Sequence, residues 1–425
     1  MKVKMIKERL YYRAPNAAVA LVVHIKGLDE PKVLKKAIEK AIEHHKVLGS
    51  KIIQDNVGDV YYASLPESSI KVEIVEEVEK KELEAFIIEQ IRIPFKISEG
   101  ELMRFFIRQQ GGYLELLLMA HHTVGDGLSY TYLIRDIMNN LENPNREEAA
   151  LPLVCFDEKE VPQKAKLNPI LKLIIRFLNK EWSKEKKVFT EQEFLDMHES
   201  YWSKRQIHML TASFTKAEIA RLKEKCKAHG ITINTALVTA FSYALGSKED
   251  IGISVSIRPQ GFEGMRNDAT GISITYDPNS KQGFWEHASC IHKLINSKLQ
   301  SPSKKFFLLK FMNALEGTLI DATYFEAFTE YANPIATKVS QMFGYHEEPK
   351  GISISNLTKV AIPNKYGPYE IENLLVIPPL MPNVKRMIGA ITLGDTMILS
   401  MQFLMGKEDK EMEATFNKAI QYLKD

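Results

Sequence analysis

Two adjacent histidines followed by an acid and a glycine form the string of the sequence most suited to chemistry. They stand in His121-His122-Thr123-Val124-Gly125-Asp126-Gly127. A neutral imidazole with its ordinary pKa of about 6.5 can accept a proton near neutral pH. Attack of an alcohol or amine on a thioester needs such an acceptor, because these nucleophiles are weak until a proton is removed. The segment therefore predicts a general base for acyl transfer.

The other residues of the string predict how such a base would be held. Neighbouring side chains at a strand end point to opposite faces, so His121 and His122 cannot easily share one task. Gly125 and Gly127 would allow a tight turn, and Asp126 would either orient the base or anchor that turn. A pair of satisfied core histidines is the structural alternative. A second pair, His44-His45, lies in a helical pattern with no Asp-Gly behind it, and we expect it at the surface.

Strand and helix patterns around the motif place it at a strand-to-helix junction. Residues 102–108 and 113–121 alternate like a hairpin across Gly111-Gly112, and 128–141 follows with helical spacing. Upstream, 17–25 predicts a strand, and a helix start after it has Asp29 as the expected cap. The motif histidines thus end a strand of the first half.

The second half combines helices with three similar strands. A capping box at Thr215 and Glu218 opens one helix, and 232–245 is apolar on nearly all faces. The strands share small residues alternating with Ile or Val: Gly252–Ser256, Gly271–Thr275 and Gly351–Ser355. Their small face suits a closely packed helix or an approaching ligand equally well.

These patterns indicate an α/β fold with mixed sheets and α+β character. At 425 residues the chain exceeds one ordinary core. We expect halves at 1–150 and 206–425 joined by a connector at 151–205. The connector's amphipathic stretch, 171–182, either packs across the halves or suits a membrane surface.

Composition narrows the partners and the compartment. The 56 basic and 54 acidic residues leave a formal charge of +2, which argues against nucleic acid. Cys155, Cys226 and Cys290 form no C-x-x-C pair, so neither a zinc site nor a disulfide framework is expected. No apolar run is long enough to cross a bilayer. We expect a cytoplasmic protein without an integral membrane segment.

The motif resembles the H-H-x-x-x-D-G signature of the chloramphenicol acetyltransferase-like superfamily. That superfamily includes condensation domains, alcohol acetyltransferases and polyketide-associated acyltransferases. The residues 93–97 before 102–105, and 231–234 in the second half, are similar to the family's flanking segments. The plant enzymes' D-F-G-W-G motif is absent, and Asn234-Thr235 differs from the Asn-Asp of the wax ester synthases.

The resemblance implies two similar half-domains forming a V around a central channel. It implies His122 as the base and Asp126 as a mainly structural residue paired with Arg258. Asn356, with Ser355 second, matches the family position expected to stabilise the oxyanion. His121 and Gly127 would support the motif.

The function expected on this basis is transfer of an acyl group from a thioester to a hydroxyl or amine. The favoured donor is acyl-CoA and the acceptor a small-molecule or lipid alcohol or amine, handled by a monomer with no metal or redox cofactor. One alternative is a free-standing condensation enzyme fed by a phosphopantetheine carrier protein. Another is a non-catalytic relative that binds a lipid or partner in the channel.

Overall fold

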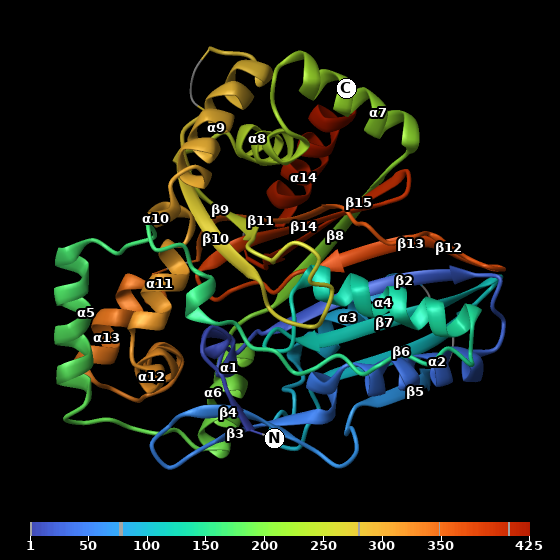
Figure 1. Cartoon of the computed structure of the whole chain (residues 1–425). Helices are drawn as coiled ribbons and strands as arrows, with labels where there is room; N and C mark the ends of the chain where they lie inside the picture. The colour runs from blue at the N-terminus through green and yellow to red at the C-terminus, as the bar shows by residue number, and fades with distance from the viewer. Residues whose placement is uncertain (1, 76–79, 279–280, 348, 407–408) are drawn as a thin grey trace.

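Two six-stranded mixed sheets, one in each of two lobes, form the framework of the chain (Figure 1). The computed structural model describes residues 2–75, 80–278, 281–347, 349–406 and 409–425. These residues form two large and separate hydrophobic cores, one on each sheet. The expected α/β fold with mixed sheets is confirmed.

The sheet of the first lobe carries the motif strand at its centre. Its order is β12-β13-β2-β7-β6-β5, where β2, β6 and β7 pair antiparallel and β5 joins β6 in parallel. The strands in that order are Lys365–Tyr366, Tyr369–Ile377, Ala18–Lys26, Tyr113–His121, Met103–Gln110 and Lys71–Val75. Helices α2, α3 and α4 belong to this lobe and span Pro31–His44, Lys80–Arg92 and Gly127–Glu142. Since β12 and β13 come from beyond residue 360, the second half of the chain completes the first lobe's sheet.

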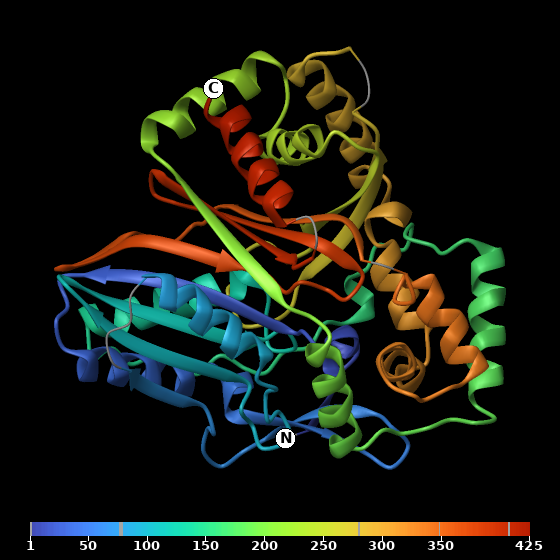
Figure 2. The same cartoon turned by 180° about the vertical axis from the view of Figure 1, so that it is seen from behind.

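The sheet of the second lobe has the order β10-β9-β11-β14-β15-β8. Its strands in that order are Ala269–Tyr276, Glu249–Ser256, Lys350–Lys359, Val384–Leu393, Thr396–Leu404 and Ile207–Phe214. The three strands with the small and apolar alternation are therefore neighbours. Helices cover the outer face of this sheet, as Figure 2 shows from behind: α7 Lys216–Ala228, α8 Ile233–Leu245, α9 Phe284–Leu299 and α14 Asp409–Lys424.

A cluster of helices flanks both lobes at the left of Figure 1. Two of its helices come from the expected connector, α5 Pro169–Trp182 and α6 Glu191–Ser203. The others come from a later segment: α11 Phe307–Ala314, α12 Gly317–Phe328 and α13 Pro334–Met342. The short elements are β1 Lys2–Lys4, β3 Ser50–Gln54, β4 Val60–Ser64, α1 Arg9–Tyr12, α10 Pro302–Lys305 and the 3-10 turns Lys46–Gly49 and Glu158–Glu160. None of the described helices is long and apolar enough to span a membrane.

Local sequence signals predicted most of these elements. The hairpin, the helix after the motif and the Thr215–Glu218 capping box are confirmed. The cap at Asp29 is wrong, because Glu30 is the N-cap residue of α2 and makes no side-chain cap bond. Proline at the first helical position already supplies a preset φ there.

Candidate active site

The motif residues form the turn between β7 and α4. Asp126 is the N-cap of α4, and its Oδ1 accepts hydrogen bonds from the Ser129 backbone N–H at 2.9 Å and the Ser129 hydroxyl at 3.0 Å. A Cβ added at Gly125 would lie 2.8 Å from Ser129 Cβ, and one at Gly127 would lie 2.7 Å from the Leu357 side chain. Both glycines are therefore needed for close approach.

The hydrogen bonds of His122 define its tautomer. Its Nδ1 lies 2.8 Å from the Gly125 carbonyl oxygen, which can only accept. We therefore assign the proton to Nδ1, which leaves the lone pair on Nε2. Nε2 makes no hydrogen bond with the described residues and is not among their fully buried unpartnered atoms, so it reaches the surface of a residue that is 8% exposed. This is the form that a general base requires.

Residues distant in the sequence hold the His122 ring in place. Asn267, fully buried between β9 and β10, donates to the His122 carbonyl oxygen at 3.1 Å and lies 3.2 Å from Nδ1. Tyr11 stacks on the ring with centroids 4.2 Å apart. Lys7 donates to the Asn267 carbonyl at 2.5 Å. The imidazole is thus clamped from both lobes.

Burial keeps both motif histidines neutral. Loss of water lowers the pKa of His122, although the bond to Gly125 and the charge of Asp126 oppose the shift. Burial, with the neighbouring His122 adding to it, lowers the pKa of His121 to about 3. His121 makes a 2.7 Å hydrogen bond to Thr123 and meets the Phe95 ring edge to face. His121 therefore faces the core, on the opposite side from Tyr11.

Asp126 forms a buried ion pair with Arg258 of the second half. Arg258 lies just after β9, and its Nη2 is 2.7 Å from Asp126 Oδ1 with side chains only 5% and 7% exposed. The second carboxylate oxygen accepts from the Asp268 backbone N–H at 2.8 Å. Arg266 adds contacts to Asp268 and to Glu160 of the connector. This network fixes the motif turn against the loop of residues 257–268, which belongs to the other lobe.

Asn356 and Ser355 lie near the end of β11, beside the motif turn. The adjacent Leu357 packs on Gly127. The Asn356 amide nitrogen is 3.3 Å from Asn234 Oδ1, while its Oδ1 accepts from the Thr358 backbone N–H at 2.8 Å. Thr358 has a φ of 57° and lies where the register of β11 shifts, so Asn356 also supports a strained irregularity of that strand. Neither residue hydrogen-bonds to His122.

Two cavities in the described residues are not lined by the base. One of about 370 Å³ opens beside α2 and α4, and one of about 20 Å³ is lined by His121, Phe95 and His198. His122 lines neither. The central channel at His122 thus stays a prediction.

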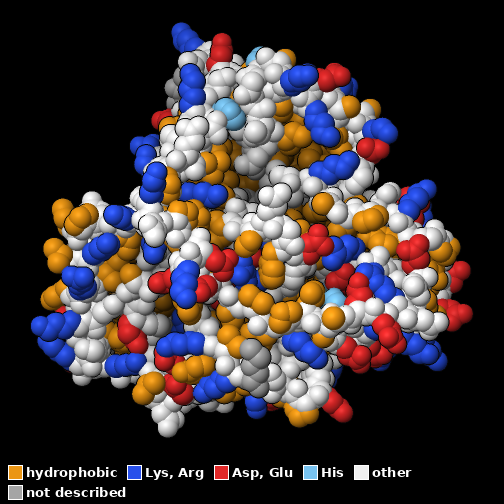
Figure 3. Space-filling model, viewed as in Figure 1, with side chains coloured by type: hydrophobic (Ala, Val, Ile, Leu, Met, Phe, Trp, Pro, Cys, Tyr) orange, Lys and Arg blue, Asp and Glu red, His pale blue; other side chains and the backbone are white. Residues whose placement is uncertain are grey.

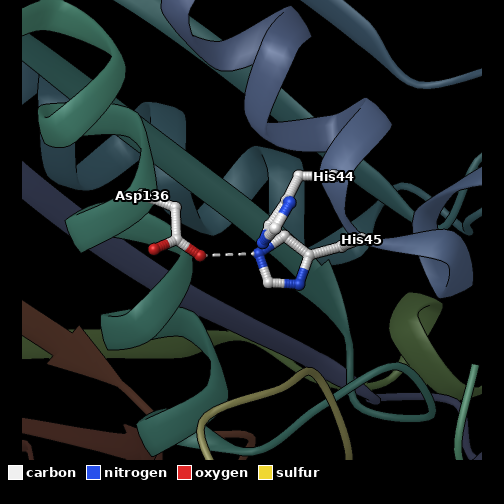
Figure 4. A group of neighbouring side chains, drawn as sticks. All are labelled: His44, His45 and Asp136. Atoms are coloured by element: carbon white, nitrogen blue, oxygen red, sulfur yellow. Dashed lines mark hydrogen bonds and ion pairs between the residues drawn. The ribbon is translucent and has the colours of Figure 1, made fainter. Parts of the chain in front are cut away.

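The second histidine pair is not a plain surface feature, and that expectation is wrong for His45. Its ring is completely buried, and Nε2 lies 3.0 Å from Asp136 Oδ2 (Figure 4). With His44 these are the group of described residues that could hold a metal ion. A metal on Nε2 would force a proton onto His45 Nδ1, which is buried without a partner. The cluster is better satisfied as a histidine–aspartate hydrogen bond between α2 and α4.

Comparison with known proteins agrees with this arrangement. Residues 11–154 match the family model of the condensation domain. The whole chain superimposes on the epimerization domain from the third module of tyrocidine synthetase B, with a TM-score of 0.62, 13% identity, and coverage of 100% and 97% of the two chains. The chain is related to condensation domains. The expected resemblance is thereby confirmed.

Two further relatives show how far this relationship extends. Surfactin synthase subunit 1 from Bacillus subtilis is 26% identical over 266 residues, which cover 59% of this chain but only 7% of the synthase. A trichothecene 15-O-acetyltransferase from Fusarium sporotrichioides shares the fold, with a TM-score of 0.65, 11% identity, and coverage of 99% and 95%. The chain thus spans a small fraction of the curated synthase. The family match supports an acyl-transferring or condensing enzyme.

Sequence reasoning missed Lys7, Tyr11 and Asn267. None belongs to a motif, and each reaches the motif only through a long-range contact. The only local signal is that Asn267 lies between residues of opposite charge, Arg266 and Asp268.

Proposed function

We propose that the chain catalyses acyl transfer from a thioester to a hydroxyl or amine, with His122 as general base. The observation that carries this proposal is the 2.8 Å hydrogen bond between His122 Nδ1 and the Gly125 carbonyl oxygen, together with an Nε2 that has no hydrogen-bond partner among the described residues. Nε2 takes the acceptor proton as the acceptor oxygen or nitrogen bonds to the thioester carbon. The tetrahedral intermediate then expels the thiolate, which receives the proton from the imidazolium.

In this mechanism Asp126 holds the motif turn in place and does not itself react. Its carboxylate bonds with Arg258, Ser129 and the Asp268 backbone, and these contacts hold the turn that carries the Gly125 carbonyl. The carbonyl in turn keeps the proton on His122 Nδ1. Asp126 is therefore a positioning residue in the proposal.

The donor in this proposal is a phosphopantetheine thioester on a carrier protein. Condensation domains act on such thioesters, and the match to this family favours that donor over the acyl-CoA expected from sequence alone. Coenzyme A presents the same phosphopantetheine arm, so both donors bring an equivalent thioester to the base. The acceptor is an alcohol or amine.

A donor comparison tests the proposal. The purified chain is incubated with one acyl group, as acyl-CoA and as acyl-carrier protein, together with a panel of alcohols and amines. Mass spectrometry should detect an ester or amide that requires the chain, with faster formation from the carrier. No product from either donor, with a ligand retained through purification, would instead support the binding-only alternative. Faster reaction from acyl-CoA would overturn the donor assignment alone.

We assign stabilisation of the oxyanion to Asn356, with Ser355 as its neighbour. Asn356→Ala should lower kcat by about 10²-fold with little change in KM, since one donor to the intermediate would be lost. Because Asn356 also accepts a hydrogen bond from the Thr358 backbone N–H, Asn356→Asp serves as the matched variant: it keeps the acceptor oxygen but removes the amide donor. Full activity in Asn356→Asp would remove Asn356 from the mechanism.

A further inference from the structure

An apolar stripe of helix α5 lies on the surface. Ile170, Leu173, Ile174 and Phe177 are 68%, 63%, 43% and 52% exposed, and they recur at the spacing of one helix face. A separate apolar stripe of α5 packs against the protein, and its residues Ile175, Leu178 and Trp182 are buried. Helix α5 therefore does not bury all of its apolar surface. It has a second apolar stripe that stays mostly exposed, and Lys338 of α13 lies over the Phe177 ring of that stripe, 5.9 Å from its centroid.

Two chain segments around this stripe are rich in basic residues. Residues 161–180 and 301–315 contain no Asp or Glu. They contain eight basic residues: Lys164, Lys166, Lys172, Arg176, Lys180, Lys304, Lys305 and Lys310. None of the eight forms an ion pair with a carboxylate of the described residues. In a chain with a formal charge of +2, this local excess is large.

The two basic segments lie side by side. At the start of α5, Ser303 bonds to the Lys166 N–H and the Lys164 carbonyl, both at 3.1 Å. At its end, Asn179 donates to the Ala314 carbonyl at 2.8 Å. Helix α11 adds Phe307 and Leu308, which are also exposed. Figure 3 shows apolar and basic side chains mixed over this flank, at the left of the view.

We infer that this face binds the surface of an anionic lipid bilayer. The face consists of the exposed apolar stripe of α5 and the basic residues of the two segments beside it. Apolar side chains along one stripe can enter the boundary between headgroups and acyl chains, and lysines beside them attract anionic headgroups. A protein partner fits less well, because the centres of protein interfaces are depleted in lysine. The lobe would lie on the membrane without crossing it.

Vesicle sedimentation of the full chain tests this inference. At low salt the chain should co-sediment with phosphatidylglycerol–phosphatidylcholine vesicles at least about tenfold more strongly than with pure phosphatidylcholine vesicles. Added salt should weaken the binding, since exposed charges are screened. Equal binding to both vesicle types, or none to the anionic ones, would overturn the inference.

Surface variants separate the face from the rest of the molecule. Leu173→Glu with Phe177→Glu should lower binding to anionic vesicles by about tenfold or more, while the fold is kept because both side chains are already exposed. Val57→Glu is the matched control, since Val57 is 61% exposed on the loop between β3 and β4. Unchanged vesicle binding by the double variant would contradict the assignment. So would a parent chain that binds no vesicles but self-associates, if the double variant abolishes that self-association.

Discussion

His122→Ala should lower the rate of acyl transfer by about 10²–10⁴-fold while leaving the fold intact, because the variant lacks only the group that accepts the acceptor's proton. The His122 side chain has few contacts to lose: its Nδ1 bonds to the Gly125 carbonyl oxygen and lies near the Asn267 amide. The rate is measured as product formed per enzyme from the better thioester donor. Circular dichroism and a urea midpoint close to that of the parent chain establish that the variant is folded.

His44→Ala provides the matched control for this experiment. His44 also belongs to an adjacent histidine pair, but it lies at the end of α2 beside Glu148 and away from the motif turn. Its removal should leave the rate unchanged. Undiminished turnover in His122→Ala, measured under the same conditions, would exclude the mechanism.

Breaking the Asp126–Arg258 pair should produce the largest loss of stability. Arg258→Met leaves the Asp126 carboxylate buried without its cation, which typically costs about 3–5 kcal/mol of unfolding free energy. Asp126→Ala also removes the cap of α4, so it should lose a similar amount or more, together with activity. Urea denaturation measures both changes.

The exposed pair of Lys216 and Asp395 is the comparison. Its atoms are 2.8 Å apart, but the side chains are 78% and 59% exposed. Lys216→Met should leave the urea midpoint unchanged, because solvent screens such pairs. An Asp126→Ala protein as stable and active as the parent chain would contradict the positioning role. A double variant less destabilised than the sum of the single variants would establish direct coupling of Asp126 and Arg258.

The part of the site that lies on one continuous segment was predictable from the sequence. The strand ending at His121, the turn and the helix starting at Gly127 follow from hydrophobic period and cap residues. Arg258 came only from the family resemblance, since no local pattern links it to Asp126, 132 residues away.

Long-range partners were beyond the reach of sequence patterns. A two-residue period predicts β13 as a strand but does not say that it pairs with β2 in the first lobe. His45 was expected at the surface because no Asp-Gly follows the pair, but its ring is buried against Asp136 of another helix. The Tyr11 and Asn267 contacts with His122 likewise depend on how the two lobes meet.

The pH dependence of kcat/KM tests the role of His122 most directly. Burial lowers the pKa of its imidazole, so the neutral base persists below pH 6.5 and is lost only on further acidification. We predict an acid limb with its midpoint below pH 6.5 in the parent chain and no such limb in the residual activity of His122→Ala. A profile that is flat through this range, or the same limb in the variant, would contradict the account.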